Sequence, residues 1–298
     1  MRKSWLLAAL FAVGCGGNVA MDESDNAADL APTGRQGGLI TSAKPTGSAA
    51  PGANGISYHG GPILTGTTNI YYIWYGNWTN NTATTILTDL GNNIGGSAYF
   101  NINTTYTNSA GTHVTNAVHY AGSTTDSYSQ GTSLTDAQIQ AVVSSAISSA
   151  RLPKDTNGLY FVLTSSDVTA SSGFCTQYCG WHTHATISGS DIKYSFVGNP
   201  DRCPSACEDQ TVGPNGNAGA DGMASILSHE LEETVTDPDL NAWYDTKGAE
   251  NADKCAWTFG TTYTANGALA NMKIGTRDYL IQQNWVNASG GYCSVKYP

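Results

Sequence analysis

Cysteine spacing constrains the fold of this chain more than any other feature of its sequence. Six cysteines lie in the second half of the chain, as two Cys-x3-Cys pairs followed by two isolated residues: Cys175, Cys179, Cys203, Cys207, Cys255 and Cys293. An even number of cysteines in an exported chain predicts a disulfide framework. Proximity favours Cys255–Cys293 as one bridge, and the other four can pair within or across the two motifs. The alternative is a four-thiolate zinc site.

The N-terminus indicates export. A short basic start at residues 1–3 precedes an apolar run over residues 5–13, which has the form of a secretory signal and is too short to span a bilayer. We therefore assign residues 1–14 to a signal peptide. The small residues around Cys15 resemble a bacterial lipobox, which predicts that Cys15 is lipidated. An ordinary signal peptide is the alternative. The mature chain is expected on the outer surface, in the periplasm or outside the cell.

The rest of the chain divides into a tether and one folded domain. Residues 15–55 have no apolar periodicity and are rich in small and polar residues, so we predict a flexible tether. Apolar patterning over residues 56–298 predicts a single α+β domain with a mixed sheet, loop-rich and held by disulfides. Helices are expected at residues 82–94, 135–152 and 221–236. Strands are expected at residues 69–75, 113–120, 159–164, 192–197, 279–286 and 294–297.

Charge excludes one class of partner. The chain carries 13 Lys and Arg against 23 Asp and Glu, a formal net charge of −10, and it has no run of basic residues. Nucleic-acid binding is disfavoured because no basic surface is available to displace counterions. We expect a monomer that meets the membrane only through its lipid anchor.

A carboxylate-rich helix is the strongest functional signal. Of the six glutamates in the chain, three fall in the segment Ser228-His-Glu-Leu-Glu-Glu233. On a helix, His229 and Glu233 share a face and can bind one metal ion, while Glu230 at the edge of that face can accept a proton from water. This is the His-Glu-x-x-His geometry of zinc peptidases with the second His replaced by Glu, which predicts a zincin-like domain. A solvated acidic face is the alternative. The histidine favours zinc over calcium.

A zinc site needs further ligands, and two segments can supply them. Glu250 and His182 are the preferred candidates, ahead of Asp253 and His184; His182 and His184, two apart, would point to the same side of a strand. Tyr244 is a candidate oxyanion donor by residue type alone. Asp237, Asp239 and Asn241 match only the first half of a calcium-binding EF-hand loop, so Asp237-Pro238 is better read as the end of the helix.

Two functions fit these residues. The first is a zinc-dependent hydrolase, most simply a peptidase, that acts on a peptide or cell-surface substrate with Glu230 as general base. The second is a non-catalytic extracellular binding protein in which the metal is structural and surface aromatic residues bind glycan or protein. Trp74, Tyr75 and Trp78 fit the core better than such a surface. A third protein ligand with one open position indicates catalysis, and a fourth protein ligand indicates structure.

Three further stretches of the sequence are distinctive: Tyr58-His-Gly-Gly-Pro62 with Ile73-Trp-Tyr-Gly76, the cysteine-rich centre from Phe174 to Cys207, and the stretch from Ala224 to Trp243 that contains His229, Glu230 and Glu233. Together these motifs resemble the exordium (phosphate-induced protein 1) family of secreted plant proteins. The similarity covers roughly residues 57–296. It implies an extracellular protein associated with growth or the cell wall, without an established biochemical activity. Asp237 stands where the family usually has Asn, and the lipobox and acidic tether are bacterial features.

Overall fold

The computed structural model of the chain describes residues 55–298. The predicted signal peptide, the lipidation at Cys15 and nearly all of the predicted tether therefore lie outside the described residues. Within residues 55–298, no helix combines the length and the apolar character that crossing a membrane requires.

A five-stranded mixed sheet forms the centre of the domain. Its strand order is β3-β2-β5-β8-β7, with β7 antiparallel to β8 and the other neighbours parallel. The strands are β2 (Thr68–Tyr75), β3 (Val118–Asp126), β5 (Gly158–Thr164), β7 (Gly180–Ile187) and β8 (Ser190–Val197). All seven residues of β5 are buried. Such a continuously apolar strand fits a parallel sheet that is covered on both faces.

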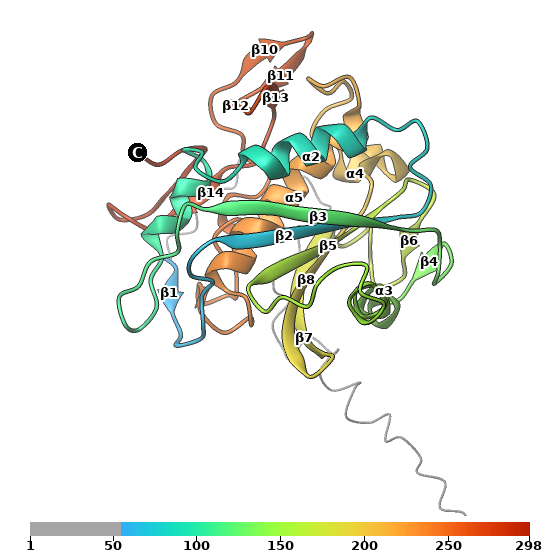
Figure 1. Ribbon diagram of the computed structural model, residues 1–298. Coiled ribbons are helices and arrows are strands. Elements are labelled where there is room, and N and C mark those ends of the chain that lie inside the picture. Colours follow the sequence, from blue (N-terminus) through green and yellow to red (C-terminus); the bar gives the residue numbers. More distant parts are fainter. Residues whose placement is uncertain (1–54) are drawn as a thin grey trace, which may run out of the picture.

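Three long helices cover the sheet. The helices α2 (Ala83–Asn93) and α5 (Ala218–Thr236) pack together on one face, and α3 (Asp136–Ser148) lies on the other (Figure 1). The helix α3 starts at a capping box in which Thr135 and Gln138 exchange side-chain and backbone hydrogen bonds. The helix α5 ends at Thr236, before Asp237-Pro238, and every residue after Ala218 is buried. A helix buried on all sides carries its glutamates into the interior.

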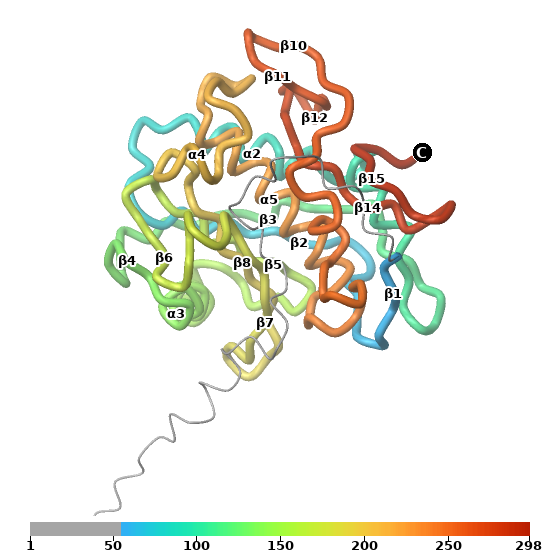
Figure 2. The backbone as a smooth tube through the Cα atoms, turned by 180° about the vertical axis from the view of Figure 1, so that it is seen from behind, coloured from blue at the N-terminus to red at the C-terminus, as the bar shows by residue number. Residues whose placement is uncertain are grey.

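Short hairpins and helical turns complete the domain. The strand pairs are β1 (Ser57–Tyr58) with β9 (Trp243–Tyr244), β4 (Ser133–Leu134) with β6 (Thr169–Ala170), β10 (Tyr263–Ala265) with β11 (Ala268–Ala270), β12 (Met272–Ile274) with β13 (Arg277–Tyr279), and β14 (Asn284–Val286) with β15 (Tyr292–Ser294). The turns are η1 (Phe100–Thr105), η2 (Pro200–Arg202), α4 (Pro204–Cys207) and η3 (Asp253–Cys255). Seen from behind, β10–β12 project from the end of the molecule opposite β7 (Figure 2).

Three disulfides hold the loops, as the cysteine count predicts. They join Cys175 to Cys203, Cys179 to Cys207, and Cys255 to Cys293. The pairing left open by the sequence therefore runs across the two Cys-x3-Cys motifs, and Cys255–Cys293 is confirmed. The four-thiolate zinc alternative is wrong, because all four sulfurs are consumed in disulfides.

The α+β class and the three predicted helices are confirmed, and the differences fall on polar strands. The strand expected at residues 113–120 is β3, at Val118–Asp126, whose partly exposed polar residues give no apolar pattern. The strand expected at residues 279–286 is two short strands, β13 and β14, because Gln282 leaves the ladder to donate to Ser225 Oγ on α5. Apolar alternation does not reveal the strand β7, because two residues on one of its sides, His182 and His184, are polar.

Candidate metal centre

The middle of α5 places three ionisable side chains inside the protein. His229, Glu230 and Glu233 have no exposed surface. His229 Nε2 lies 2.9 Å from Glu233 Oε1, one helical turn away. The shared face predicted from their spacing is therefore present, and it is turned towards the interior rather than towards solvent. The alternative of a solvated acidic helix face is wrong.

The edge strand β7 brings His182 to the same place. Its Nε2 lies 3.2 Å from Glu250 Oε2 and 3.7 Å from Glu233 Oε2. Gly180 permits this approach: a Cβ there would lie 2.6 Å from Ile226 Cγ2 and 3.1 Å from Glu230 Oε1. A larger residue at position 180 would push β7 away from α5, and His182 with it.

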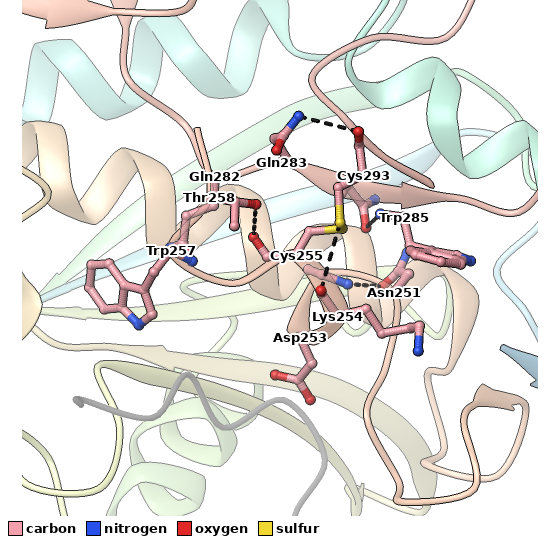
Figure 3. The surroundings of a disulfide bond; sticks show 12 residues. Asn251, Asp253, Lys254, Cys255, Trp257, Thr258, Gln282, Gln283, Trp285 and Cys293 are labelled. Carbon is pink, nitrogen blue, oxygen red and sulfur yellow. Dashed lines mark hydrogen bonds between the residues drawn. A yellow bond between two sulfur atoms is a disulfide. The ribbon is translucent and has the colours of Figure 1, made fainter. Parts of the chain in front are cut away.

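The segment after α5 supplies the remaining carboxylates, Glu250 and Asp253. Asp253 Oδ1 lies 3.5 Å from His229 Nε2, and its backbone N–H donates to Glu233 Oε1 over 3.0 Å. The Cys255–Cys293 disulfide ties this segment to β15, and Figure 3 shows Asp253 pointing away from the sulfur atoms. Lys254, the next residue, is held by Asp245 at 3.0 Å. Asp253 is therefore followed directly by two residues that are held in place, one by an ion pair and one by a disulfide.

We call these six side chains the α5 cluster: His182, His229, Glu230, Glu233, Glu250 and Asp253. Five of them form two overlapping groups, His182 with Glu230 and Glu233, and His229 with Glu233 and Asp253, in each of which one ligand atom per residue lies within 4.8 Å of the others. Glu250 joins the cluster through His182, 3.2 Å away. Glu233 belongs to both groups. The four preferred metal ligands are thus brought together, and Asp253, which ranked lower, joins them.

The electrostatics of the α5 cluster are unbalanced. Neither carboxylate oxygen of Glu230 accepts a hydrogen bond from the described residues, nor does Glu233 Oε2. Burial, and then the neighbouring Glu233, raise the pKa of Glu230 well above its usual value. Burial alone would lower the pKa of His229, but Glu233, Asp253 and Glu230 outweigh it and raise that pKa. Buried charge of one sign without compensation is costly, so the cluster needs protons or a cation.

The third glutamate of the helix points elsewhere. Glu232 is equally buried, but its Oε2 accepts a hydrogen bond from Asn284 on β14. Asn251 donates to its backbone carbonyl over 3.1 Å. Glu232 thus belongs to an amide network on another side of α5, which makes it a natural control for its neighbours.

A second histidine–carboxylate group lies two residues further along β7. We call it the His184 cluster: His184, Asp191, Asp239 and Lys193. His184 Nδ1 is 2.9 Å from Asp191 Oδ1, and Lys193 Nζ is 2.6 Å from Asp239 Oδ1 and also contacts Asp191. His184 points to the same side as His182, as strand geometry predicts, but it reaches a different group. Asp239 of the calcium-like motif is thus paired with a lysine.

Tyr244 lies in a different setting from the α5 cluster. It is part of β9, and its ring stacks on His59 with 3.6 Å between the ring centroids. His59 Nε2 also lies 3.1 Å from the Tyr244 carbonyl oxygen. These contacts give no support to an oxyanion role, which stays a prediction.

Asp253 ranks below Glu250 and His182 as a candidate ligand on sequence alone. Its spacing from Glu250 still indicates a shared site, because the two residues are three apart and a single turn can point both side chains the same way. The backbone N–H of Asp253 fixes Glu233, a contact that no residue pattern reveals.

Comparisons with known proteins agree over most of the domain. The family model described as "Phosphate-induced protein 1 conserved region" matches residues 56–282. The chain is 34% identical over 280 residues to Protein EXORDIUM-like 3 of Arabidopsis thaliana, covering 80% of this chain and 82% of that protein. It is also 34% identical over 279 residues to Protein EXORDIUM-like 5 of the same plant, covering 77% and 75%. No solved structure matches the chain.

Proposed function

The chain belongs to the phosphate-induced protein 1 (exordium) family, and from the α5 cluster we propose that it is an exported zinc-dependent hydrolase with a zincin-like centre. The observation that carries the proposal is the Glu230 carboxylate, fully buried beside histidine ligands and without a hydrogen-bond partner among the described residues. Three disulfides fit an extracellular or secreted protein. Lipidation of Cys15, a monomeric state and the absence of nucleic-acid contacts belong to the same proposal.

Ligand spacing supports zinc. Two ligands bound to one tetrahedral zinc at about 2.0–2.2 Å lie roughly 3.3–3.6 Å apart. The short nitrogen–oxygen separations here are 2.9 Å for His229 with Glu233, 3.2 Å for His182 with Glu250 and 3.5 Å for His229 with Asp253. The last already lies in that range, and small side-chain movements bring the other two into it. Mixed imidazole and carboxylate ligands suit zinc and do not favour calcium.

The residues of the chain then have separate tasks. Bound zinc acidifies water and polarises a carbonyl group. His229, His182, Glu233 and Glu250 hold the ion, and Glu230 accepts the proton of the attacking water before returning it to the leaving group. The raised pKa of Glu230, which burial causes, brings this carboxyl closer to the working range of a general base.

The position of the centre supports a peptide substrate. The strand β7, which carries His182, is the edge strand of the five-stranded sheet. An extended peptide can bind to such an edge by adding a strand, which places its carbonyl groups at regular intervals beside the sheet. A peptide on β7 would pass close to His182.

Complete burial favours a second candidate, a structural metal in a non-catalytic binding protein. His182, His229, Glu233 and Glu250 together provide four protein ligands, and their side chains have no more than 2% exposure. A closed four-ligand site is typical of structural zinc. Trp74 and Tyr75 are also buried, so they do not form a surface platform for glycan.

The test compares wild type with Glu230→Gln and with Glu232→Gln as the matched control. Zinc content and cleavage of a broad peptide library are measured for all three. We expect Glu230→Gln to keep its zinc and lose cleavage by about a hundredfold or more, because an amide cannot accept the water proton. Glu232→Gln should cleave like wild type. Wild type that holds zinc but cleaves nothing supports the structural metal, and wild type without metal excludes both functions.

A further inference from the structure

The two carboxylate oxygens of Glu233 lie near two different histidines. Oε1 lies 2.9 Å from His229 Nε2 and accepts the N–H of Asp253. Oε2 lies 3.7 Å from His182 Nε2 on β7 and has no hydrogen-bond partner among the described residues. Each oxygen therefore points to a different histidine, on a different element of the fold.

Each histidine also has a carboxylate of its own. His182 Nε2 is 3.2 Å from Glu250 Oε2, whereas His229 Nε2 is 3.5 Å from Asp253 Oδ1. The two histidine–carboxylate pairs thus match in composition, one imidazole and one carboxylate each, with Glu233 between them. A histidine in place of Glu233 would offer one nitrogen to one ion only, but a carboxylate can bind two ions through its two oxygens.

The negative charge of the α5 cluster also favours a second cation. Glu230, Glu233 and Asp253 belong to the two groups of candidate ligands, and Glu250 joins them through His182. All of these carboxylates except Asp253 are fully buried. Within residues 55–298, the ion-pair partners of Glu233 and Asp253 are histidines, and no Lys or Arg pairs with Glu230. One divalent cation cannot balance the three negative charges of Glu230, Glu233 and Asp253, whereas two divalent cations can. Uncompensated buried charge destabilises the folded protein.

We infer that the α5 cluster binds two divalent metal ions bridged by Glu233, one on the His182–Glu250 side and one on the His229–Asp253 side. The inference rests on the proposed function, because it requires a metal centre at these residues, and it adds the second ion and the bridging role. In two-metal sites the ions lie about 3.5–4 Å apart and can together activate the attacking water and polarise the group that it attacks. Glu230 keeps the role of base beside the His182 ion.

The test counts the ions in the full mature chain. Metal-free protein is titrated with zinc against a chromophoric chelator, and Co(II) is added stepwise in a parallel experiment followed by electron paramagnetic resonance. We expect two tight zinc equivalents per chain, and a Co(II) signal that grows with the first equivalent and weakens through spin coupling with the second.

Variants assign each ion. Asp253→Asn and His182→Gln should each retain about one equivalent. Glu233→Gln should lose most of both equivalents and the coupling with them, and Glu232→Gln should match wild type. One equivalent in wild type, or two without coupling, overturns the bridged pair and leaves the zinc proposal standing. No bound metal overturns both. The wild-type counts decide the question even where a variant fails to fold.

Discussion

The α5 cluster and the His184 cluster are built from similar residues and share the strand β7, yet they differ in what balances their charge. Both combine histidine with aspartate or glutamate, and His182 of the first lies two residues before His184 of the second on β7. The His184 cluster contains Lys193, whose ammonium group contacts Asp191 and Asp239. It is also partly exposed, with 45% of the Asp191 side chain open to solvent.

The comparison teaches that a histidine near carboxylates is not sufficient to indicate a metal site. A lysine already supplies the cation in the His184 cluster, and water screens what remains. Neither Lys nor Arg pairs with Glu230, Glu233 or Asp253 within the described residues, and burial removes the screening. What distinguishes the α5 cluster from the His184 cluster is that, among the described residues, no Lys or Arg pairs with these three carboxylates; the presence of histidine and carboxylate side chains is common to both.

Removing metal should produce the largest difference between the two clusters. A ligand that binds only the folded state adds about 4 kcal/mol of stability when its free concentration is a thousandfold above Kd. A strong chelator should therefore lower the unfolding temperature of wild type clearly, and Glu233→Gln should already be destabilised and insensitive to chelator. The measurement is thermal unfolding with and without chelator. An unchanged melting temperature in wild type would contradict a stabilising metal.

The approach of β7 to α5 gives a second test. A methyl group at position 180 would lie 2.6 Å from Ile226 Cγ2, so Gly180→Ala should cost about 1–3 kcal/mol through overpacking. It should also weaken metal binding, because His182 moves with the strand, while the His184 cluster on the far part of β7 stays intact. Denaturant unfolding and zinc affinity are measured together. Wild-type values for both would show that the close contact does not position His182.

The sequence predicts most of the elements of the fold and part of the α5 cluster. Apolar periodicity located α2, α3, α5, β2, β5 and β8, and the spacing of His229 and Glu233 indicated their shared face. The strand β7 does not stand out because polar side chains interrupt its apolar pattern, and the bounds of β3 are shifted because it is a partly exposed edge strand. The pairing of Lys193 with Asp239 joins residues far apart in the chain, so only the fold reveals that one cluster has its own cation.

Glu232 provides a pH test that separates the two sides of α5. Burial raises the pKa of Glu232 well above its usual value, so the folded state holds this proton more tightly than the unfolded state. Its contribution to stability is present below the unfolded pKa and is lost as pH rises through the folded pKa. In metal-loaded protein, the unfolding free energy of Glu232→Gln should therefore fall less than that of wild type as the pH rises from about 5 to about 8. Unfolding free energies across that range check this, and equal slopes would contradict it.

Lys193→Met should have the smallest effect on the metal. Asp191 is open to solvent, but the Lys193 side chain is only 7% exposed, so its loss leaves Asp239 without its cation and should cost about 1–3 kcal/mol. The α5 cluster should keep its metal content unchanged. Thermal unfolding and zinc content measure the two effects. A loss of zinc from Lys193→Met would mean that the two clusters act as one site and that the comparison fails.

The most direct test of the central claim is the metal content of the purified protein. Wild type, Glu233→Gln and Glu232→Gln are expressed as exported, disulfide-bonded chains, exchanged into metal-free buffer and analysed by inductively coupled plasma mass spectrometry. The account predicts at least one zinc ion per chain in wild type and Glu232→Gln, and a large loss in Glu233→Gln, although both glutamates are equally buried on the same helix. Wild type that contains no stoichiometric metal, or a Glu232→Gln variant that loses it as Glu233→Gln does, would contradict a metal centre at the α5 cluster.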